Sequence, residues 1–122
     1  MNRSSNRHGT LGSILKSQLV YISGPITGIL QSTLRFKETE KRLTDDGHKV
    51  LNPMDIEDPR DNNLEEGELW IYYMKKALAM LLTADCIYMM EGWEKSKGAR
   101  MEFWIATELN IPVHYAHEDY KY

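Results

Sequence analysis

Glu102 is the residue whose surroundings point most directly to chemistry. It falls in a predicted helix from about residue 97 to residue 109, on a side that is otherwise small or apolar. That side, traced at about 100° per residue, also carries Gly98, Ala99, Phe103, Ile105, Ala106 and Leu109. A carboxylate in such a stripe costs free energy unless it is paired or used. Glu102 is therefore either a reactive carboxylate or a structural one bound to a nearby amide or tyrosine.

Two glycine-containing loops predict a binding site for a phosphate-bearing ligand beside this helix. Ser96 and Gly98 at the helix start offer a hydroxyl group and close backbone approach to an anion. The other loop follows an apolar run and contributes Ser23, Gly24, Thr27 and Gly28. Trp93, in the loop before the helix, is suited to stacking on a nucleobase. The alternatives are an ordinary tight turn, an ordinary helix cap and a packed Trp93.

Four short apolar runs predict the β-strands that position these groups. They are Leu19–Ile22, Lys49–Leu51, Cys86–Met90 and Val113–Tyr115. Apolar residues at helical spacing predict helices at about 31–46, 70–81 and 97–109. Because continuously apolar strands alternate with helices, we expect a parallel sheet with helices on both faces.

The expected fold is therefore α/β, a small Rossmann-like or flavodoxin-like domain of three layers. Right-handed crossovers favour the strand order 2-1-3-4. Such sheets bind ligands beyond the carboxyl ends of the strands, where the strand order reverses. Here that point lies between the first and third strands, beside both glycine-containing loops. The sequence thus predicts that Glu102 and the two loops share one crevice.

The composition is that of one ordinary globular domain, which we place at residues 18–122. The polar residues 1–17 lack the apolar segment of a secretory signal and are interpreted as a disordered tail or an expression remnant. A net charge of −3 without a basic cluster disfavours a nucleic-acid polymer as partner. No apolar stretch reaches the roughly 20 residues of a membrane helix. The single cysteine, Cys86, excludes an internal disulfide and fits a cytoplasmic protein.

Several further residues have structural expectations. Trp70 shares the apolar side of its predicted helix and is expected in the core, with base stacking as the alternative. Asp85 should lie at the amino end of its strand, in a structural role. The acidic stretch 54–67 is expected to be a solvated lid rather than a cation site. The histidines show no metal-ligand spacing with Cys86, so we expect neither a metal nor a cofactor.

Met101 and Trp104 are large apolar residues on the otherwise polar side of the helix that carries Glu102. Large apolar side chains exposed to solvent mark contact surfaces. We therefore expect a homodimer or a higher homo-oligomer held through these residues. The alternative is that the C-terminal segment folds over them.

From about Leu19 to Val113 the chain resembles the nucleoside 2-deoxyribosyltransferase-like superfamily, and most closely its short bacterial and phage domains of unassigned function. The residues that carry the resemblance are Tyr21-Ile22-Ser23-Gly24-Pro25-Ile26-Thr27-Gly28, Asn52-Pro53, Trp70, Tyr73-Met74 and Asp85. The most specific run is Gly92-Trp93-Glu94-Lys95-Ser96-Lys97-Gly98-Ala99-Arg100-Met101-Glu102. The resemblance implies a nucleoside or nucleotide ligand, bound in part beside Asn52.

In that superfamily a glutamate attacks C1′ of a deoxyribose and displaces the base, and the sugar then passes to another base or to water. Glu102 matches this glutamate through the spacing Ser-x-Gly-x-x-x-Glu. Tyr21 matches a first-strand tyrosine that positions the carboxylate, and Ser96 matches a serine that contacts the 5′-phosphate in the hydrolases. The chemistry is coherent, because a carboxylate can trap an oxocarbenium-like centre as a covalent glycosyl intermediate.

Several positions depart from the superfamily pattern. Ala77 stands where an acidic residue usually assists the leaving base. Thr27 stands where the hydrolases carry a phosphate-binding arginine, and Pro25 stands where they carry an accompanying serine. Asp55 and Glu91 are candidates to replace the acid. Three functions follow: cleavage or transfer at the N-glycosidic bond of a deoxynucleoside or its 5′-monophosphate, a non-catalytic nucleotide-binding module, or a dimerising interaction protein with a vestigial pocket. The sequence does not distinguish the base, the sugar, the need for a phosphate or the acceptor.

Overall fold

The computed structural model describes residues 16–60 and 63–116, so the tail expected over residues 1–17 lies almost wholly outside the described residues. A four-stranded parallel sheet forms its centre, in the order β2-β1-β3-β4. The strands are β1 (Leu19–Ser23), β2 (Lys49–Leu51), β3 (Cys86–Met89) and β4 (Val113–Tyr115). The predicted sheet, its parallel pairing and its strand order are confirmed.

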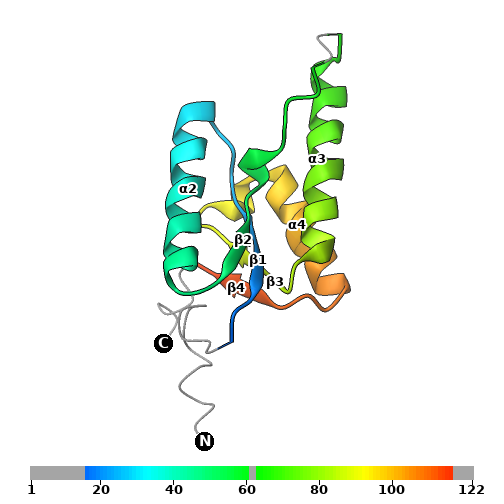
Figure 1. Ribbon diagram of the computed structural model, residues 1–122. Coiled ribbons are helices and arrows are strands. Elements are labelled where there is room, and N and C mark those ends of the chain that lie inside the picture. The colour runs from blue at the N-terminus through cyan, green and yellow to red at the C-terminus, as the bar shows by residue number, and fades with distance from the viewer. Residues whose placement is uncertain (1–15, 61–62, 117–122) are drawn as a thin grey trace, which may run out of the picture.

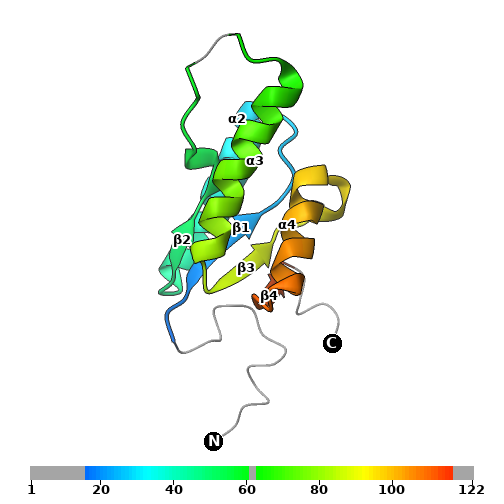
Figure 2. The same cartoon turned by 90° about the vertical axis from the view of Figure 1, so that its right-hand side faces the viewer.

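Helices cover both faces of the sheet (Figure 1 and Figure 2). The long helices are α2 (Ile29–Asp45), α3 (Glu66–Thr83) and α4 (Lys97–Glu108), and two short 3₁₀ helices are η2 (Pro53–Asp55) and η3 (Trp93–Lys95). Helix α2 packs on one face, where its buried residues meet Val20 and Ile22, while α3 and α4 pack on the other face against Tyr21 and Ile87. The three-layer α/β architecture is confirmed.

Alternation along β1 decides which side chains meet α4. Successive strand residues point to opposite faces of a sheet. Val20 and Ile22 therefore join the core under α2, whereas Tyr21 joins the core under α3 and α4. Ser23, two residues further, points the same way as Tyr21. The carboxyl-terminal half of this strand thus presents two hydroxyl groups, those of Tyr21 and Ser23, to the layer that holds Glu102.

Local signals in the sequence account for the element boundaries. Gly47, at φ +98°, follows α2 in the left-handed conformation that only glycine adopts without strain. The Ser96 hydroxyl accepts a hydrogen bond from the Ala99 N–H at 3.1 Å and caps α4, which is the role that the sequence offered as the alternative to anion binding. Asp85 accepts from the Leu19 N–H at 2.8 Å and so joins the amino ends of β1 and β3, which is the structural role expected of it.

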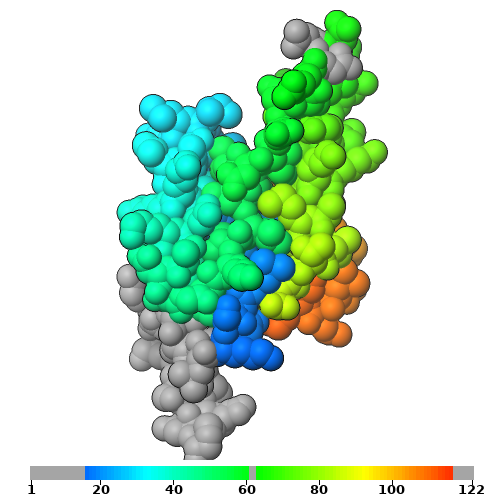
Figure 3. All heavy atoms as spheres, viewed as in Figure 1, coloured from blue at the N-terminus to red at the C-terminus, as the bar shows by residue number. Residues whose placement is uncertain are grey.

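The N-terminal half of α3 extends beyond the carboxyl edge of the sheet (Figure 1). The helix has 18 residues, whereas β3 has four. The helix therefore rises about 27 Å, roughly twice the length of the strand it covers. Figure 3 shows the resulting hollow at the top of the molecule, between α2 and the projecting half of α3. The position of the candidate site follows from this mismatch in length.

Candidate functional site

The Glu102 carboxylate is buried and both of its oxygens accept a hydrogen bond. The side chain is only 5% exposed. The Tyr21 hydroxyl donates to Oε2 at 2.6 Å, and the Ser23 hydroxyl donates to Oε1 at 2.6 Å. Distances this short are typical of hydroxyl donors to an ionised carboxylate. Two residues of one strand therefore fix the plane of this carboxylate.

Burial and hydrogen bonding have opposite effects on the pKa of Glu102. Burial raises the pKa of its carboxyl group, while the bonds from Ser23 and Tyr21 lower it, and the net pKa lies above the usual glutamate value. Burial, the Glu102 charge and the shared hydrogen bond together raise the pKa of Tyr21 well above its ordinary value. Tyr21 is thus a protonated donor at neutral pH. The group it holds is a poorly hydrated carboxylate, suited to act as a nucleophile or a base.

A cavity of about 990 Å³ opens over Glu102 at the carboxyl edge of the sheet. Its innermost residues, Tyr21, Ala77, Ala99 and Glu102, are buried. Its walls carry half-buried side chains, among them Trp70, Tyr73 and Met74. Its mouth is formed by exposed residues that include Ile26, Ile29, Asp58 and Glu66. The volume lies at the upper end of the range for small-molecule sites and is large enough for a nucleotide.

Charge is distributed unevenly around this cavity. Arg35, Lys95 and Lys97 lie on the side of α2 and the start of α4 together with one acidic residue, Glu91, whereas the charged lining residues on the side of α3 are Asp58 and Glu66. The Lys97 ammonium sits 4.4 Å from the centre of the Trp70 ring and so links α4 to α3. A ligand with an anionic end and an aromatic end would therefore meet suitable groups on both sides.

The structure brings most of the predicted site residues together. Glu102, Tyr21, Gly24, Thr27, Ser96 and Gly98 all line the cavity, and Ser23 lies beneath it in contact with Glu102. A side chain at Gly24 would place its Cβ 2.9 Å from the Met90 Cβ, so only glycine fits at this position. The two loops and the nucleophile candidate form one crevice.

Three predicted binding residues lie elsewhere. The Asn52 amide donates to Glu40 at 2.9 Å and its oxygen caps η2, so this side chain supports the loop instead of facing the cavity. Gly28 is the N-cap of α2 and is not a lining residue. Trp93 packs against Phe103, with ring centres 4.7 Å apart, and against Tyr115 at 6.3 Å. Trp93 does not line the cavity, and its contacts match the alternative of a packed side chain.

The expectation that Trp70 belongs to the core is also wrong. Trp70 lines the cavity together with Tyr73, one turn along α3. Sequence reasoning missed Tyr73, Asp58, Arg35, Lys95 and Lys97 as well. The signal that would have found Trp70 and Tyr73 is the length of the helix, since its first turns have no strand to cover. The charged residues carry no such signal.

The structure also tests two departures from the superfamily pattern. Ala77 lines the inner cavity at 5% exposure, so no acid is present at that point of the wall. Asp55 does not line the cavity, whereas Glu91 does. Arg35 lines the cavity near Thr27 in the same loop-and-helix region, and its guanidinium donates to the Glu91 carbonyl at 3.0 Å. Arg35 of α2 therefore contributes a cationic side chain to the cavity lining.

The helix that carries Glu102 has a narrower apolar side than expected. Leu109 is 54% exposed and lies at the end of α4 instead of in the core. Trp104 is 62% exposed, as its position predicts, whereas Met101 is half-buried. Across the described part of the chain, no group of three or more His, Cys, Asp or Glu side chains is arranged to hold a metal. Nor does any helix of residues 16–60 and 63–116 have the length and hydropathy to cross a membrane.

Comparison with known proteins places the chain in a family. A family model described as a domain of unknown function (DUF4406) matches residues 18–115. The chain belongs to this family. Comparison of this DUF4406 chain with the curated proteins gives no match.

Two solved structures share the fold. A 2-deoxyribosyltransferase from Bacillus psychrosaccharolyticus, a biocatalyst for nucleoside synthesis, aligns with a TM-score of 0.63 and 21% identity over 80% of this chain and 70% of that chain. A conserved protein from Enterococcus faecalis V583 aligns with a TM-score of 0.58 and 16% identity, over 82% of this chain and 63% of that chain, which is less than two thirds of its length. The resemblance to the nucleoside 2-deoxyribosyltransferase-like superfamily is thereby confirmed for the fold.

Proposed function

We propose that this DUF4406 domain cleaves or transfers the N-glycosidic bond of a deoxynucleoside or a deoxynucleoside 5′-monophosphate. The observation that carries the proposal is the Glu102 carboxylate, held through both oxygens by Tyr21 and Ser23 at the floor of a nucleotide-sized cavity. The fold shared with a 2-deoxyribosyltransferase is consistent with it.

The reaction takes two steps. A carboxylate oxygen of Glu102 attacks C1′, and the C1′–N bond breaks with its electron pair leaving on the base. Water, or an N–H nitrogen of a second base, then attacks C1′, and the bond from C1′ to the Glu102 oxygen breaks with its electron pair returning to the carboxylate. The proton that the attacking group loses passes to the departed base. Tyr21 and Ser23 hold the Glu102 carboxylate in place, and this positioning increases the rate because it aligns the attacking oxygen with C1′.

The charges and rings of the cavity suggest how the substrate lies. A base would stack on Tyr73 and on Trp70 on the α3 side, with the Lys97 ammonium, which lies 4.4 Å from the centre of the Trp70 ring, on the opposite face of that ring. A 5′-phosphate would point toward the start of α4, where Ser96 and Lys95 line the cavity beside a helix N-terminus. The sugar would then lie above Glu102, between the two ends.

Release of free base tests the proposal directly. The protein is incubated with 2′-deoxynucleosides and their 5′-monophosphates, with and without acceptor bases, and the products are separated by chromatography. We expect base release or exchange in the wild type and none in Glu102→Ala. Equal release by the two proteins would remove Glu102 as nucleophile.

A non-catalytic nucleotide-binding module is the second candidate. It is favoured by Ala77, which leaves the inner α3 wall without an acid to assist the departing base. Calorimetry that detects nucleotide binding without any turnover would support this function. Absence of binding to every nucleotide would count against both candidates.

A homodimer or higher homo-oligomer is proposed for either function. The exposed Trp104, together with the half-buried Met101 on the same helix, supports a contact surface. Light scattering of the wild type and Trp104→Glu measures the effect. We expect the substitution to reduce the molar mass toward that of one chain, and an unchanged mass would leave this surface unexplained.

A further inference from the structure

The outer wall of the cavity carries a carboxylate that the proposed reaction does not use. Asp58 lies in the stretch that joins η2 to α3, and it lines the cavity together with Trp70 and Tyr73. The acidic stretch was expected to be a solvated lid, but here it contributes a wall. Its placement bears on which base the cavity accepts.

The backbone around Asp58 is fixed on both sides. The Asp58 Oδ1 accepts a hydrogen bond from the Arg60 N–H at 3.1 Å, which closes a tight turn. The Tyr72 hydroxyl donates to the Glu57 carbonyl at 3.2 Å and so ties the segment to α3. Burial, the charge of Asp58 and the neighbouring Tyr72 together raise the pKa of Tyr73 above its ordinary value. Asp58 Oδ2 accepts no hydrogen bond from another described residue.

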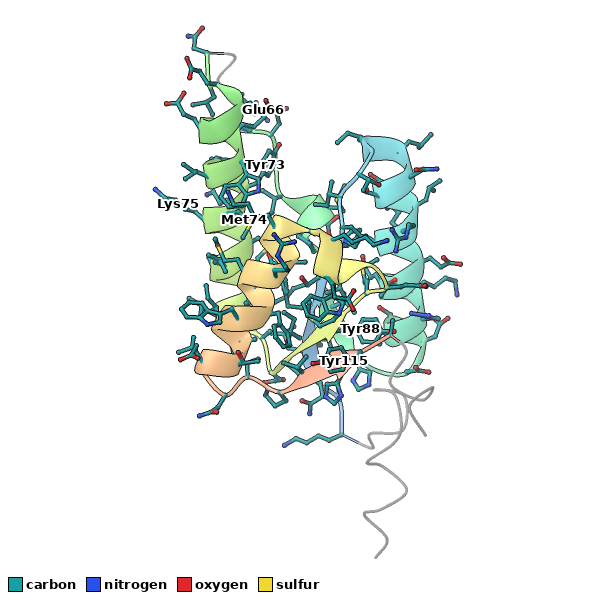
Figure 4. All side chains as sticks on the ribbon, turned by 180° about the vertical axis from the view of Figure 1, so that it is seen from behind. Glu66, Tyr73, Met74, Lys75, Tyr88 and Tyr115 are labelled. Atoms are coloured by element: carbon teal, nitrogen blue, oxygen red, sulfur yellow. The ribbon has the colours of Figure 1, made fainter. Side chains whose placement is uncertain are left out.

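The α3 wall itself offers few polar groups at this depth. Between Trp70 and Ala77, the only polar side chain that lines the cavity is Tyr73. Glu66 lies seven residues before Tyr73, about 10 Å further along the axis, and Figure 4 shows it near the outer end of α3. Glu66 and Asp58 are both exposed residues of the mouth, and Asp58 reaches the cavity from the stretch before α3 and not from the helix itself.

We propose that Asp58 determines base specificity by accepting a hydrogen bond from an exocyclic amino group of the base stacked on Trp70. This inference rests on the proposed function and names its substrate class: 2′-deoxynucleosides of amino-bearing bases, of the adenine and cytosine type. A base with a carbonyl group at that edge would set an oxygen lone pair against a carboxylate, which is repulsive. A stacked base also covers Asp58 and removes water that would otherwise satisfy it.

Two matched substrates test the inference. 2′-Deoxyadenosine and 2′-deoxyinosine differ only in an amino or an oxo group at one ring position, and kcat/KM is measured for each. For each protein, the kcat/KM for 2′-deoxyadenosine is divided by the kcat/KM for 2′-deoxyinosine. We expect this ratio to be about tenfold higher in the wild type than in Asp58→Asn. The ratio between the two proteins cancels the intrinsic reactivity of the substrates. Asparagine also keeps the turn at Arg60 and can donate to an oxo group, so the preference should disappear or invert.

Two variants serve as controls. Asp55→Asn changes an exposed carboxylate of the same stretch that does not line the cavity. Glu66→Gln changes the carboxylate at the mouth. Both should keep the wild-type ratio. An Asp58→Asn ratio equal to that of the wild type would overturn the inference.

Failure of this inference is distinguishable from failure of the proposed function. If the wild type releases no base, or if Glu102→Ala releases as much, the reaction is wrong and Asp58 is tested by binding alone. Calorimetry with free adenine and free hypoxanthine needs no turnover. We expect adenine to bind about tenfold more tightly than hypoxanthine to the wild type and equally to Asp58→Asn. Equal affinities in the wild type would reject the role of Asp58 whatever the reaction.

Discussion

The floor and the outer wall of the cavity are built on different principles. The floor comes from β1 and α4, is buried, and gives both oxygens of Glu102 a hydroxyl donor. The outer wall comes from the projecting half of α3 and the stretch before it, and its rings and charges are half-buried or exposed. Because the floor is packed on the sheet and the wall is not, substitutions at the floor should change the reaction, while substitutions at the wall should change which ligand binds.

The largest expected effect is at the floor. Glu102→Gln keeps the shape of the side chain but removes the nucleophilic oxygen, so we expect kcat to fall by about four orders of magnitude or more. Substrate binding, measured by calorimetry with an uncleaved nucleotide, should change by less than about threefold. A variant that keeps more than a tenth of the wild-type kcat would show that the floor carries no chemistry.

The hydroxyl groups that hold Glu102 should have the next largest effect. Tyr21→Phe removes the donor to Oε2, and loss of a hydrogen bond to a charged group corresponds to about a ten- to hundredfold fall in kcat. Because that bond lowers the pKa of Glu102, its loss should also move the acid limb of the pH–rate profile to higher pH. Tyr88→Phe is the matched control, since Tyr88 faces the α2 layer of the same sheet and accepts from Arg42. An unshifted acid limb in Tyr21→Phe would contradict the assignment.

The two tryptophans extend the comparison to smaller effects. Trp70→Leu removes a ring from the outer wall and should raise KM by about tenfold, with little change in the free energy of unfolding. Trp93→Leu removes a ring packed on Phe103 and Tyr115, so it should lower the free energy of unfolding by about 2 kcal/mol and leave KM near the wild-type value. Denaturant titration and initial rates measure both quantities. The same pattern for both variants would remove the distinction between wall and core.

Much of the floor was predictable from the sequence. Continuous apolar runs alternating with helical periodicity indicated a parallel sheet, and its order follows from short right-handed crossovers. The odd carboxylate in the apolar side of α4 then placed Glu102 toward the sheet. Tyr21 was assigned to Glu102 only through the resemblance to the superfamily, and the alternation along β1 that brings them into one layer is seen in the structure. The pairing of Ser23 with Glu102 Oε1 was not predicted, because a serine in a glycine-containing loop equally suits ligand binding.

The wall was not predictable in the same way. Helical periodicity does not say whether an apolar side faces a sheet or a cavity, so Trp70 was expected in the core although it lines the cavity. Asp58 comes from a stretch without secondary structure, whose path depends on a tertiary hydrogen bond from Tyr72. Hydrophobic periodicity predicts the helices and strands of a domain and their apolar faces. It does not predict which part of a helix extends beyond the sheet, because the periodicity is the same in both parts.

The smallest expected effect is on the pH dependence of stability, and it again concerns the floor. Since burial raises the pKa of Glu102, the folded protein binds a proton that the unfolded chain releases near the usual glutamate value of about 4.5. The stability from this group is therefore fully present below that pH and is lost as pH rises through the higher folded pKa. The Glu102→Gln variant has no titrating group at this position. The free energy of unfolding of the variant minus that of the wild type should therefore increase as pH rises from about 4.5 to the folded pKa of Glu102, and then become constant. Urea titrations at a series of pH values measure the difference, with Glu108→Gln on the exposed side of α4 as the control for an amide substitution. A difference that falls with rising pH would mean that the two hydroxyl donors outweigh burial, and that the floor stabilises the charged carboxylate instead of tolerating it.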